Sequence, residues 1–211
     1  VVPLPLARQW QVELKDLFGL KARVLTKENL TEDLPHGIYI GGREFIGSPT
    51  WMPRVRSLGP WDLVVIDEAH EMMSSLHVRF SLKDGSYESR LSKKGARRAA
   101  AILEVKGDSP ALILTATPIQ NSLYELWSLV YLVDQNFQVL GPLNQFTRLF
   151  TADKGRSVVP EMQKELTRRL EMAVARTLRT QAQPFLKVKF TKRHCHTVNF
   201  HMDAVEKDLY D

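Results

Sequence analysis

Two adjacent acids, Asp67 and Glu68, directly follow an aliphatic run from Leu63 to Ile66. Such a run, without polar alternation, is typical of a strand buried on both faces, as in a parallel sheet covered by helices. Ligands of open α/β sheets bind at the carboxyl ends of the strands. Asp67 is therefore a candidate to hold Mg²⁺ on nucleotide phosphates, and Glu68 to orient or deprotonate an attacking water. The alternative is a polar turn with two solvated carboxylates, but the length of the Asp-Glu-Ala-His motif favours the nucleotide site.

A second apolar run, Ala111 to Leu114, is followed by Thr115-Ala116-Thr117-Pro118. This order predicts two hydroxyl groups at the carboxyl end of a strand beside the strand that carries the acids. Hydroxyls in that place can bond to His70 or to the carboxylates and connect the nucleotide to the rest of the molecule. A threonine-rich turn with a proline at a helix start is the alternative, and it is common by itself. The conjunction with the Asp-Glu-Ala-His strand favours the functional interpretation.

Predicted helices and strands alternate along the chain, which indicates a parallel α/β sheet. Helical spacing predicts a helix over residues 5–18 that stops at Gly19, with an inward stripe of Leu6, Trp10, Leu14 and Leu17 or Phe18. Further helices are expected over residues 52–58, 96–105, 122–133 and 161–181, and strands over residues 22–25, 38–40, 63–66, 111–114 and 197–202. Residues 74–94 are expected to form a surface loop, and residues 137–160 to be irregular. Glu125 stands three residues after Ser122, in a capping-box relation.

Composition sets limits on the class of protein. The chain has 211 residues and a formal charge of +5, which is compatible with a polyanionic partner but does not require one. The single cysteine, Cys195, excludes an internal disulfide and favours a reducing compartment. No apolar stretch is long enough to span a bilayer and no signal peptide is visible, so we expect a cytoplasmic protein without a membrane partner. The first residue is not Met, and we expect the chain to be a segment of a longer protein.

Three segments carry a resemblance to a known family. Residues Pro3 to Trp10, Val65 to His70 and Leu114 to Asn121 resemble, in order and rough spacing, the Swi/Snf-type helicase-like ATPases of helicase superfamily two. The resemblance covers nearly the whole chain, and residues 37–45, 59–71 and 178–210 are most similar to the bacterial branch related to the RNA-polymerase-recycling ATPase. It implies an incomplete RecA-like first lobe over residues 1–136, a helical insertion over residues 137–194 and the start of a second RecA-like lobe over residues 195–211.

The resemblance also implies a function. In this family two lobes close on ATP while they grip double-stranded DNA, so the chain is expected to be part of an ATP-dependent DNA translocase that uses ATP and Mg²⁺. RNA polymerase or another DNA-bound protein is a further candidate partner. By the resemblance, Asp67 is the magnesium-linked acid and Glu68 the catalytic base, and Thr115 and Thr117 couple hydrolysis to DNA movement, with His70 and Gln120 in the same network. Gln9 and Trp10 lie in the segment near the DNA backbone, although the place of Trp10 on the apolar stripe favours a core residue.

The chain departs from the family pattern in two ways. No Gly-Lys-Ser/Thr phosphate loop occurs in the 211 residues, and the Gly41-Gly42 pair is interpreted as a tight turn. The arginines of the second lobe are expected beyond Asp211. Without the phosphate loop, the β- and γ-phosphates lose most of their contacts, so this chain alone is expected to show little or no ATPase activity. The alternative function is a non-catalytic module that docks DNA or a polymerase. A nuclease that uses Asp67 and Glu68 as metal ligands is a third possibility, but the chain lacks additional acidic or lysine residues at suitable spacing.

Basic residues and metal-binding residue types occur in three further groups. Lys93, Lys94, Arg97 and Arg98 form a dense basic patch that is a candidate for DNA-backbone contact. The arginines of the helix predicted over residues 161–181 are better explained as a solvated face paired with glutamates. His194, Cys195 and His196 do not have the spacing of a zinc site.

Overall fold

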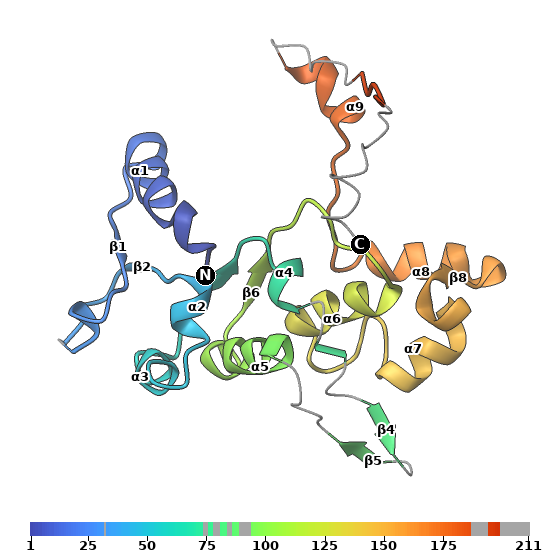
Figure 1. The fold of residues 1–211 in the computed structure, drawn as a ribbon, viewed down its shortest axis with the longest axis horizontal. Helices are drawn as coiled ribbons and strands as arrows, with labels where there is room; N and C mark the ends of the chain where they lie inside the picture. The colour runs from blue at the N-terminus through green and yellow to red at the C-terminus, as the bar shows by residue number, and fades with distance from the viewer. Residues whose placement is uncertain are drawn as a thin grey trace, which may run out of the picture. The chain divides into compact units, whose positions relative to one another are not determined.

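The computed structural model describes residues 1–31, 33–73, 76–77, 81–83, 86–88, 94–186 and 194–198. The chain divides into two compact units, Val1–Val174 and Ala175–Asp211 (Figure 1). The lobe and insertion boundaries expected at residues 136 and 194 stay predictions. Among the described residues, no helix combines the length and apolar character needed to cross a bilayer.

Parallel pairing of the two predicted site strands is the central feature of the first unit. Strand β3 (Val64–Ile66) pairs in parallel with β6 (Ala111–Ile113), and Ile66 lies opposite Ile113. Strand β1 (Ala22–Val24) pairs in parallel with β2 (Ile38–Ile40). The Val1–Val2 segment runs between the two pairs, since Val2 bridges Gly42 and the Asp67 amide donates to the Val1 carbonyl at 2.8 Å. The predicted parallel α/β arrangement is therefore confirmed.

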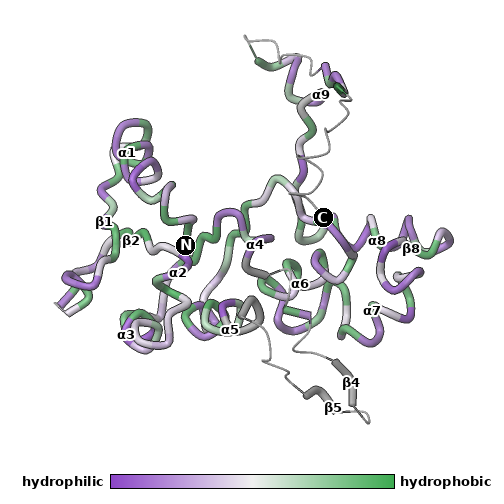
Figure 2. The backbone as a smooth tube through the Cα atoms, in the orientation of Figure 1, coloured by the Kyte–Doolittle hydropathy of each residue, from purple (hydrophilic) through white to green (hydrophobic). Residues whose placement is uncertain are grey.

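Helix α1 (Ala7–Phe18) follows the 3₁₀ turn η1 (Leu4–Leu6) and ends, as predicted, at Gly19, whose φ of 69° is left-handed. Its inner side, with Trp10 and Leu14, packs against Val2 and Ala22. Figure 2 shows the alternation of hydrophilic and hydrophobic residues along α1. The expected inward position of Leu17 or Phe18 is wrong, because these side chains are 70% and 69% exposed. The three-residue strands β1 and β2 offer a small surface, which the side chains nearer the start of α1 already cover.

The main core lies on one face of β3 and β6. Ile66 of β3 and Leu132 of α6 (Leu123–Val133) are fully buried, and Ile102 of α5 (Lys94–Lys106) is 1% exposed. On the other side Leu63 and Leu112 are 53% and 49% exposed. The expectation of a strand buried on both faces is thus wrong for the described residues, because their helices cover a single face. The remaining short elements around this core are η2 (Asn29–Thr31), α2 (Arg43–Ile46), α3 (Met52–Ser57) and α4 (His70–Met73).

A second core joins α6 to the residues that follow it. Trp127 of α6 packs with Phe146 and Phe150 of α7 (Leu143–Phe150), where the sequence predicted irregular structure. The Trp127 indole donates to the Gly141 carbonyl at 3.0 Å. The region continues through β7 (Thr151–Ala152), η4 (Asp153–Gly155), β8 (Ser157–Val158), η5 (Pro160–Met162) and α8 (Gln163–Leu170), with β7 and β8 antiparallel.

The long helix expected over residues 161–181 is wrong. Helix α8 ends at Leu170, and α9 (Arg179–Ala182) and η6 (Gln183–Phe185) are separate short elements. The side chains of residues 171–178 are exposed, so no packing offsets the cost of ordering them as helix.

Two further expectations concern segments that are only partly described. Within the predicted loop at residues 74–94, β4 (Ser81–Lys83) and β5 (Ser86–Glu88) pair with each other in antiparallel orientation. Of the strand predicted over residues 197–202, only Thr197 and Val198 belong to the described residues, and they have no regular structure; the rest lies outside.

Candidate functional site

The segments after β3 and β6 lie side by side at the carboxyl edge of the two strands. The Leu114 amide donates to the Ile66 carbonyl at 2.9 Å, and the Ala69 amide donates back to the Leu114 carbonyl at 3.2 Å. These two bonds extend the parallel ladder past the strand ends. The Asp-Glu-Ala-His turn and the Thr-Ala-Thr-Pro turn are therefore neighbours, as the sequence predicted.

Both oxygens of the Asp67 carboxylate have defined donors. Oδ1 accepts the Glu68 amide at 3.0 Å, and Oδ2 accepts the Trp10 indole Nε1–H at 2.9 Å. A carboxylate offers about four lone-pair sites, so each oxygen keeps a lone pair that these two donors do not use. Trp10 is half-buried and packs in the core, as the apolar stripe favoured, but its bond to Asp67 had no signal in the sequence.

Glu68 occupies an unusual backbone conformation. Its φ is +48°, in the left-handed region that L residues other than glycine rarely adopt. Such a residue costs on the order of 1–3 kcal/mol and is concentrated at functional sites. Its Oε2 is buried without a hydrogen-bond partner among the described residues, 3.3 Å from His70 Nδ1. Glu68 is thus an acid held at the strand end, with one buried oxygen that has no hydrogen-bond donor among the described residues and lies beside His70.

A chain of polar contacts leads from His70 into the second turn. His70 Nδ1 and Thr115 Oγ1 are hydrogen-bonded at 2.8 Å. The Thr117 amide donates to Thr115 Oγ1 at 3.2 Å, and Gln120 Nε2 donates to Thr117 Oγ1 at 3.4 Å. The structure therefore brings together His70, Thr115, Thr117 and Gln120, which the sequence grouped in one network.

Glu125 fixes the end of this second turn, a role that sequence reasoning missed. Its side chain is 6% exposed, and Oε2 accepts the Gln120 amide at 2.6 Å and the Asn121 amide at 3.1 Å. Burial raises the pKa of the Glu125 carboxyl, but the hydrogen bonds from Gln120 and Asn121 outweigh it and hold the pKa below its usual value. Only half of the capping box expected with Ser122 is present. The Ser122 side chain makes no cap bond, whereas the Glu125 carboxylate interacts with the Ser122 backbone and also accepts from the two preceding amides.

Arg43 is a second residue that the sequence did not single out. It lies in α2, directly after the Gly41-Gly42 turn, and forms ion pairs with Glu71 in α4 and with its neighbour Glu44. Its amide also donates to the Val2 carbonyl at 2.9 Å. Arg43 therefore ties α4, which begins at His70, to the β2 side of the sheet.

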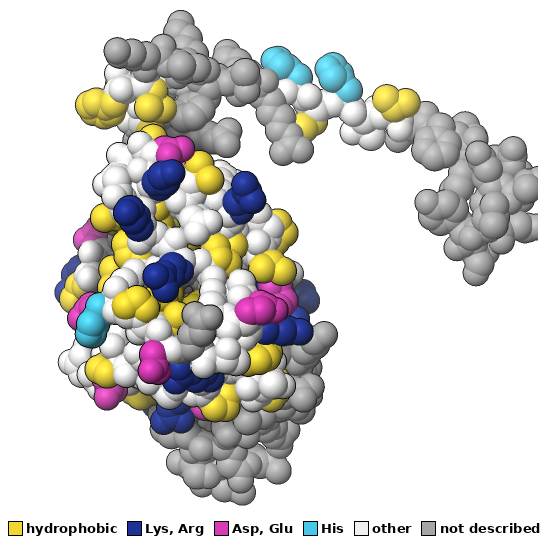
Figure 3. All heavy atoms as spheres, turned by 90° about the vertical axis from the view of Figure 1, so that its left-hand side faces the viewer, with side chains coloured by type: hydrophobic (Ala, Val, Ile, Leu, Met, Phe, Trp, Pro, Cys, Tyr) yellow, Lys and Arg dark blue, Asp and Glu magenta, His cyan; other side chains and the backbone are white. Residues whose placement is uncertain are grey.

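The expected DNA-contact residues are only partly described. Gln9 is exposed on α1 and donates to Glu13 Oε1 at 2.8 Å. Arg98 is half-buried, with its aliphatic part against Gly47 and its charge near Glu44. Lys93 and the side chains of Lys94 and Arg97 lie outside the described residues. Figure 3 shows Lys and Arg side chains on one face, interspersed with acidic and hydrophobic ones. The DNA-contact roles stay predictions.

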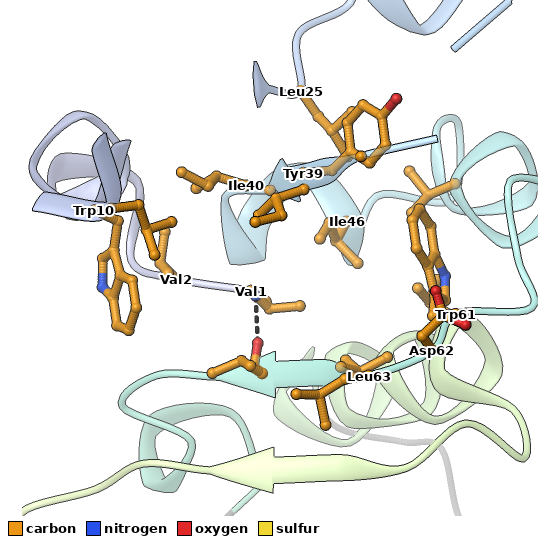
Figure 4. A pocket seen from close by; sticks show the side chains of 18 of the residues that line it. Val1, Val2, Trp10, Leu25, Tyr39, Ile40, Ile46, Trp61, Asp62 and Leu63 are labelled. Atoms are coloured by element: carbon orange, nitrogen blue, oxygen red, sulfur yellow. Dashed lines mark hydrogen bonds between the residues drawn. The ribbon is translucent and has the colours of Figure 1, made fainter. Parts of the chain in front are cut away.

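A cavity of about 460 Å³ lies elsewhere, between β2 and β3. Its lining is mainly apolar and includes Val1, Trp10, Ile40 and Trp61, which Figure 4 shows around it. Neither Asp67 nor Glu68 lines this cavity, so it is not the candidate nucleotide site.

Comparison with known proteins identifies the family. The family model of the SNF2-related domain matches residues 87–211, more than half of the chain. The chain belongs to the SNF2-related family. This confirms the predicted resemblance to Swi/Snf-type helicase-like ATPases.

Two proteins illustrate how the SNF2-related chain compares with its relatives. It is 28% identical over 211 residues to the uncharacterized ATP-dependent helicase YqhH of Bacillus subtilis. The alignment covers 100% of this chain and 32% of that protein. It is 40% identical over 86 residues to the DNA excision repair protein ERCC-6-like of Bos taurus, which is 41% of this chain and 5% of that protein. The chain thus spans about a third of the length of YqhH.

A solved structure shows the fold of this SNF2-related chain. It superposes on the Sulfolobus solfataricus SWI2/SNF2 ATPase core in complex with dsDNA with a TM-score of 0.60 and 21% identity, over 83% of this chain and 32% of that one. The predicted RecA-like α/β fold is therefore confirmed.

The residues at the strand edge fit a magnesium ion that is held mainly by a nucleotide. Mg²⁺ is usually bound through one or two carboxylates together with waters and phosphate oxygens, not by an all-protein cage. The described residues contain no group of three or more His, Cys, Asp or Glu that could form such a cage. They do provide the Asp67 carboxylate and the Glu68 carboxylate at the end of β3, and the buried Glu68 Oε2 has no hydrogen-bond partner among them.

Proposed function

We propose that this SNF2-related chain forms part of an ATP-dependent motor that translocates along double-stranded DNA and remodels protein–DNA complexes. The observation that carries the proposal is the juxtaposition of Asp67 and Glu68 with Thr115 at adjacent strand ends, joined through the His70–Thr115 hydrogen bond of 2.8 Å. Family membership supports ATP use, and the double-stranded DNA in the SWI2/SNF2 core complex supports the choice of nucleic acid.

In this proposal the two acids have different tasks. Asp67, oriented by the Glu68 amide and the Trp10 indole, would hold Mg²⁺ on the nucleotide. The ion would supply positive charge that offsets charge on the phosphate oxygens. Glu68, with its uncommitted Oε2, would orient the attacking water and accept its proton.

The second turn would communicate the state of the nucleotide to the rest of the molecule. His70 lies next to Glu68 and is hydrogen-bonded to Thr115. A movement of the Glu68 side chain would therefore alter, through His70, the contacts of the Thr115–Gln120 turn. That turn continues into α6, whose Trp127 packs in the second core with α7. The proposed consequence is that hydrolysis moves α6 and residues 137–174, and with them DNA contacts.

Displacement of a third strand from a DNA triplex tests the proposed activity. The intact protein is expected to release the third strand when ATP is present, and not with a non-hydrolysable analogue. A Glu68→Gln variant should fail in the same assay. Strand release that does not depend on ATP, or an intact protein that binds duplex DNA without ever moving, would favour the alternative of a non-catalytic docking module.

A further inference from the structure

The indole of Trp10 makes a hydrogen bond that packing alone does not require. Trp10 lies on α1, 57 residues before Asp67, and its Nε1–H donates to Asp67 Oδ2 at 2.9 Å. Its ring packs beside Val2, Ala7 and Ile40, and Figure 4 shows it next to Val2. Packing could be satisfied by any aromatic ring, whereas the bond needs an N–H at this place.

The bond completes the orientation of the Asp67 carboxylate. Oδ1 is held by the Glu68 amide at 3.0 Å, so the indole fixes the second oxygen and with it the plane of the carboxylate. The backbone amide of Asp67 itself donates a hydrogen bond to the Val1 carbonyl. An indole N–H carries no charge, so it directs the carboxylate without the opposing charge that Lys or Arg would bring to a metal ligand. Donors of this kind orient metal-binding side chains in many proteins.

We propose that Trp10 is a positioning residue for the metal-binding acid Asp67, and that α1 is connected to the site through this bond. The proposal rests on the proposed function of Asp67. Trp10 does not touch the nucleotide; it acts through Asp67 by holding the carboxylate in the orientation that Mg²⁺ needs.

The chain offers a matched pair of variants. Trp10→Phe keeps an aromatic ring in the core and removes the N–H. Trp61→Phe makes the same change at a half-buried indole whose Nε1 is buried without a hydrogen-bond partner among the described residues. Trp61 also packs against the main core, so a general effect of losing an indole ring appears in both variants.

The first measurement is the Mg²⁺ concentration that gives half-maximal ATP hydrolysis by the intact protein at saturating ATP. Trp10→Phe is expected to raise it by about tenfold or more, the usual effect of removing a partner that orients a metal ligand. Hydrolysis should recover largely at high Mg²⁺, and Trp61→Phe should match the unaltered protein. An unchanged Mg²⁺ requirement in Trp10→Phe would overturn the proposal, as would an equal shift in both variants.

A second measurement does not depend on activity. With ¹⁵N-labelled tryptophan, the four indoles of the chain give separate N–H signals, and the signal absent from Trp10→Phe is that of Trp10. Asp67→Asn should shift the Trp10 signal and leave that of Trp61 in place; no shift would contradict the bond.

Asp67→Asn also distinguishes a failure of the function proposed for Asp67 from a failure of the positioning role of Trp10. If Asp67→Asn leaves the Mg²⁺ requirement unchanged, the proposed function of Asp67 fails, and the role of Trp10 fails with it. If Asp67→Asn changes that requirement and Trp10→Phe does not, only the positioning role of Trp10 is wrong.

Discussion

At the scale of single residues, buried polar groups hold the two turns of the candidate site. Glu125 has the most partners among them: two amides and the Asn121 side chain donate to its carboxylate. A carboxylate that accepts several hydrogen bonds favours its ionised form. The geometry of the Thr115–Gln120 turn therefore depends on a charge that lies outside the turn itself.

Glu125 gives a pH-dependent prediction. Its pKa in the folded chain lies below the ordinary value of 4.5, so its contribution to stability is fully present above pH 4.5 and is lost as the pH falls through the folded pKa. Glu125→Gln should lower the free energy of unfolding at pH 7 by about 1–3 kcal/mol, because the buried amides lose a charged acceptor. The difference from the unaltered chain should shrink as the pH falls below 4.5.

Urea unfolding at a series of pH values measures this effect. Glu104→Gln is the matched control, since Glu104 is exposed on α5 and its pair with Arg56 spans 3.7 Å. If Glu125→Gln lowers the free energy of unfolding by the same amount at neutral and acidic pH, the result would contradict stabilisation by an ionised Glu125 carboxylate.

At the scale of secondary-structure elements, α6 belongs to both cores. Leu129 and Leu132 face the core of β3 and α5, whereas Leu126 and Trp127 face α7. A helix buried on two sides is expected to transmit a change at its start to both neighbours. Only Asn121 and Ser122 separate the Thr115–Gln120 turn from the start of α6.

Trp127 gives a prediction for the second core. It is 1% exposed, and its indole bonds to Gly141. Trp127→Ala should lower the free energy of unfolding by about 3–5 kcal/mol, because the cavity it leaves is large. Thermal unfolding followed by circular dichroism measures the loss. Phe185→Ala, at a side chain that is 88% exposed, should change the free energy of unfolding little. Similar losses for the two variants would contradict the packing described.

The sequence predicted elements well where local signals and packing agree. The predictions match strand β2, helix α3 and the end of α1 at Gly19. In these places the signals, which are the spacing of apolar residues and the positions of glycine and proline, act on the local backbone. Helix α7 was missed although Leu143, Phe146 and Phe150 have helical spacing, because the partner they pack on, Trp127, is distant in the sequence. The predicted extension of α8 beyond Leu170 is wrong. The apolar residues after Leu170 have helical spacing, but their side chains are exposed and pack on nothing among the described residues that would stabilise a helix.

The candidate site shows the same limit. The neighbouring strand ends and the His70–Thr115 contact were predictable, because parallel strands present their carboxyl ends at one edge. The donors Trp10 and Arg43 and the acceptor Glu125 were not predicted as partners of the site, because their bonds depend on how α1, α2 and α6 are placed in three dimensions.

At the scale of the whole molecule, the chain carries Asp67, Glu68 and the Thr115–Gln120 turn, but no Gly-Lys-Ser/Thr segment within its 211 residues. The backbone amides and lysine of such a segment provide most contacts to the β- and γ-phosphates. We therefore predict that the 211-residue chain alone shows little or no DNA-stimulated phosphate release, while the intact protein shows it. Robust turnover by the chain alone would mean that other residues bind the phosphates.

Replacement of Glu68 by Gln in the intact protein is the most direct test of the account. Phosphate release is measured with and without duplex DNA, and nucleotide binding is measured on the same preparations, with Glu104→Gln as control. We predict that Glu68→Gln lowers DNA-stimulated hydrolysis by about 10²-fold or more while nucleotide binding is retained, because the group that accepts the proton of water is lost. Turnover equal to that of the unaltered protein would contradict the assignment of Glu68 and, with it, the proposed motor site.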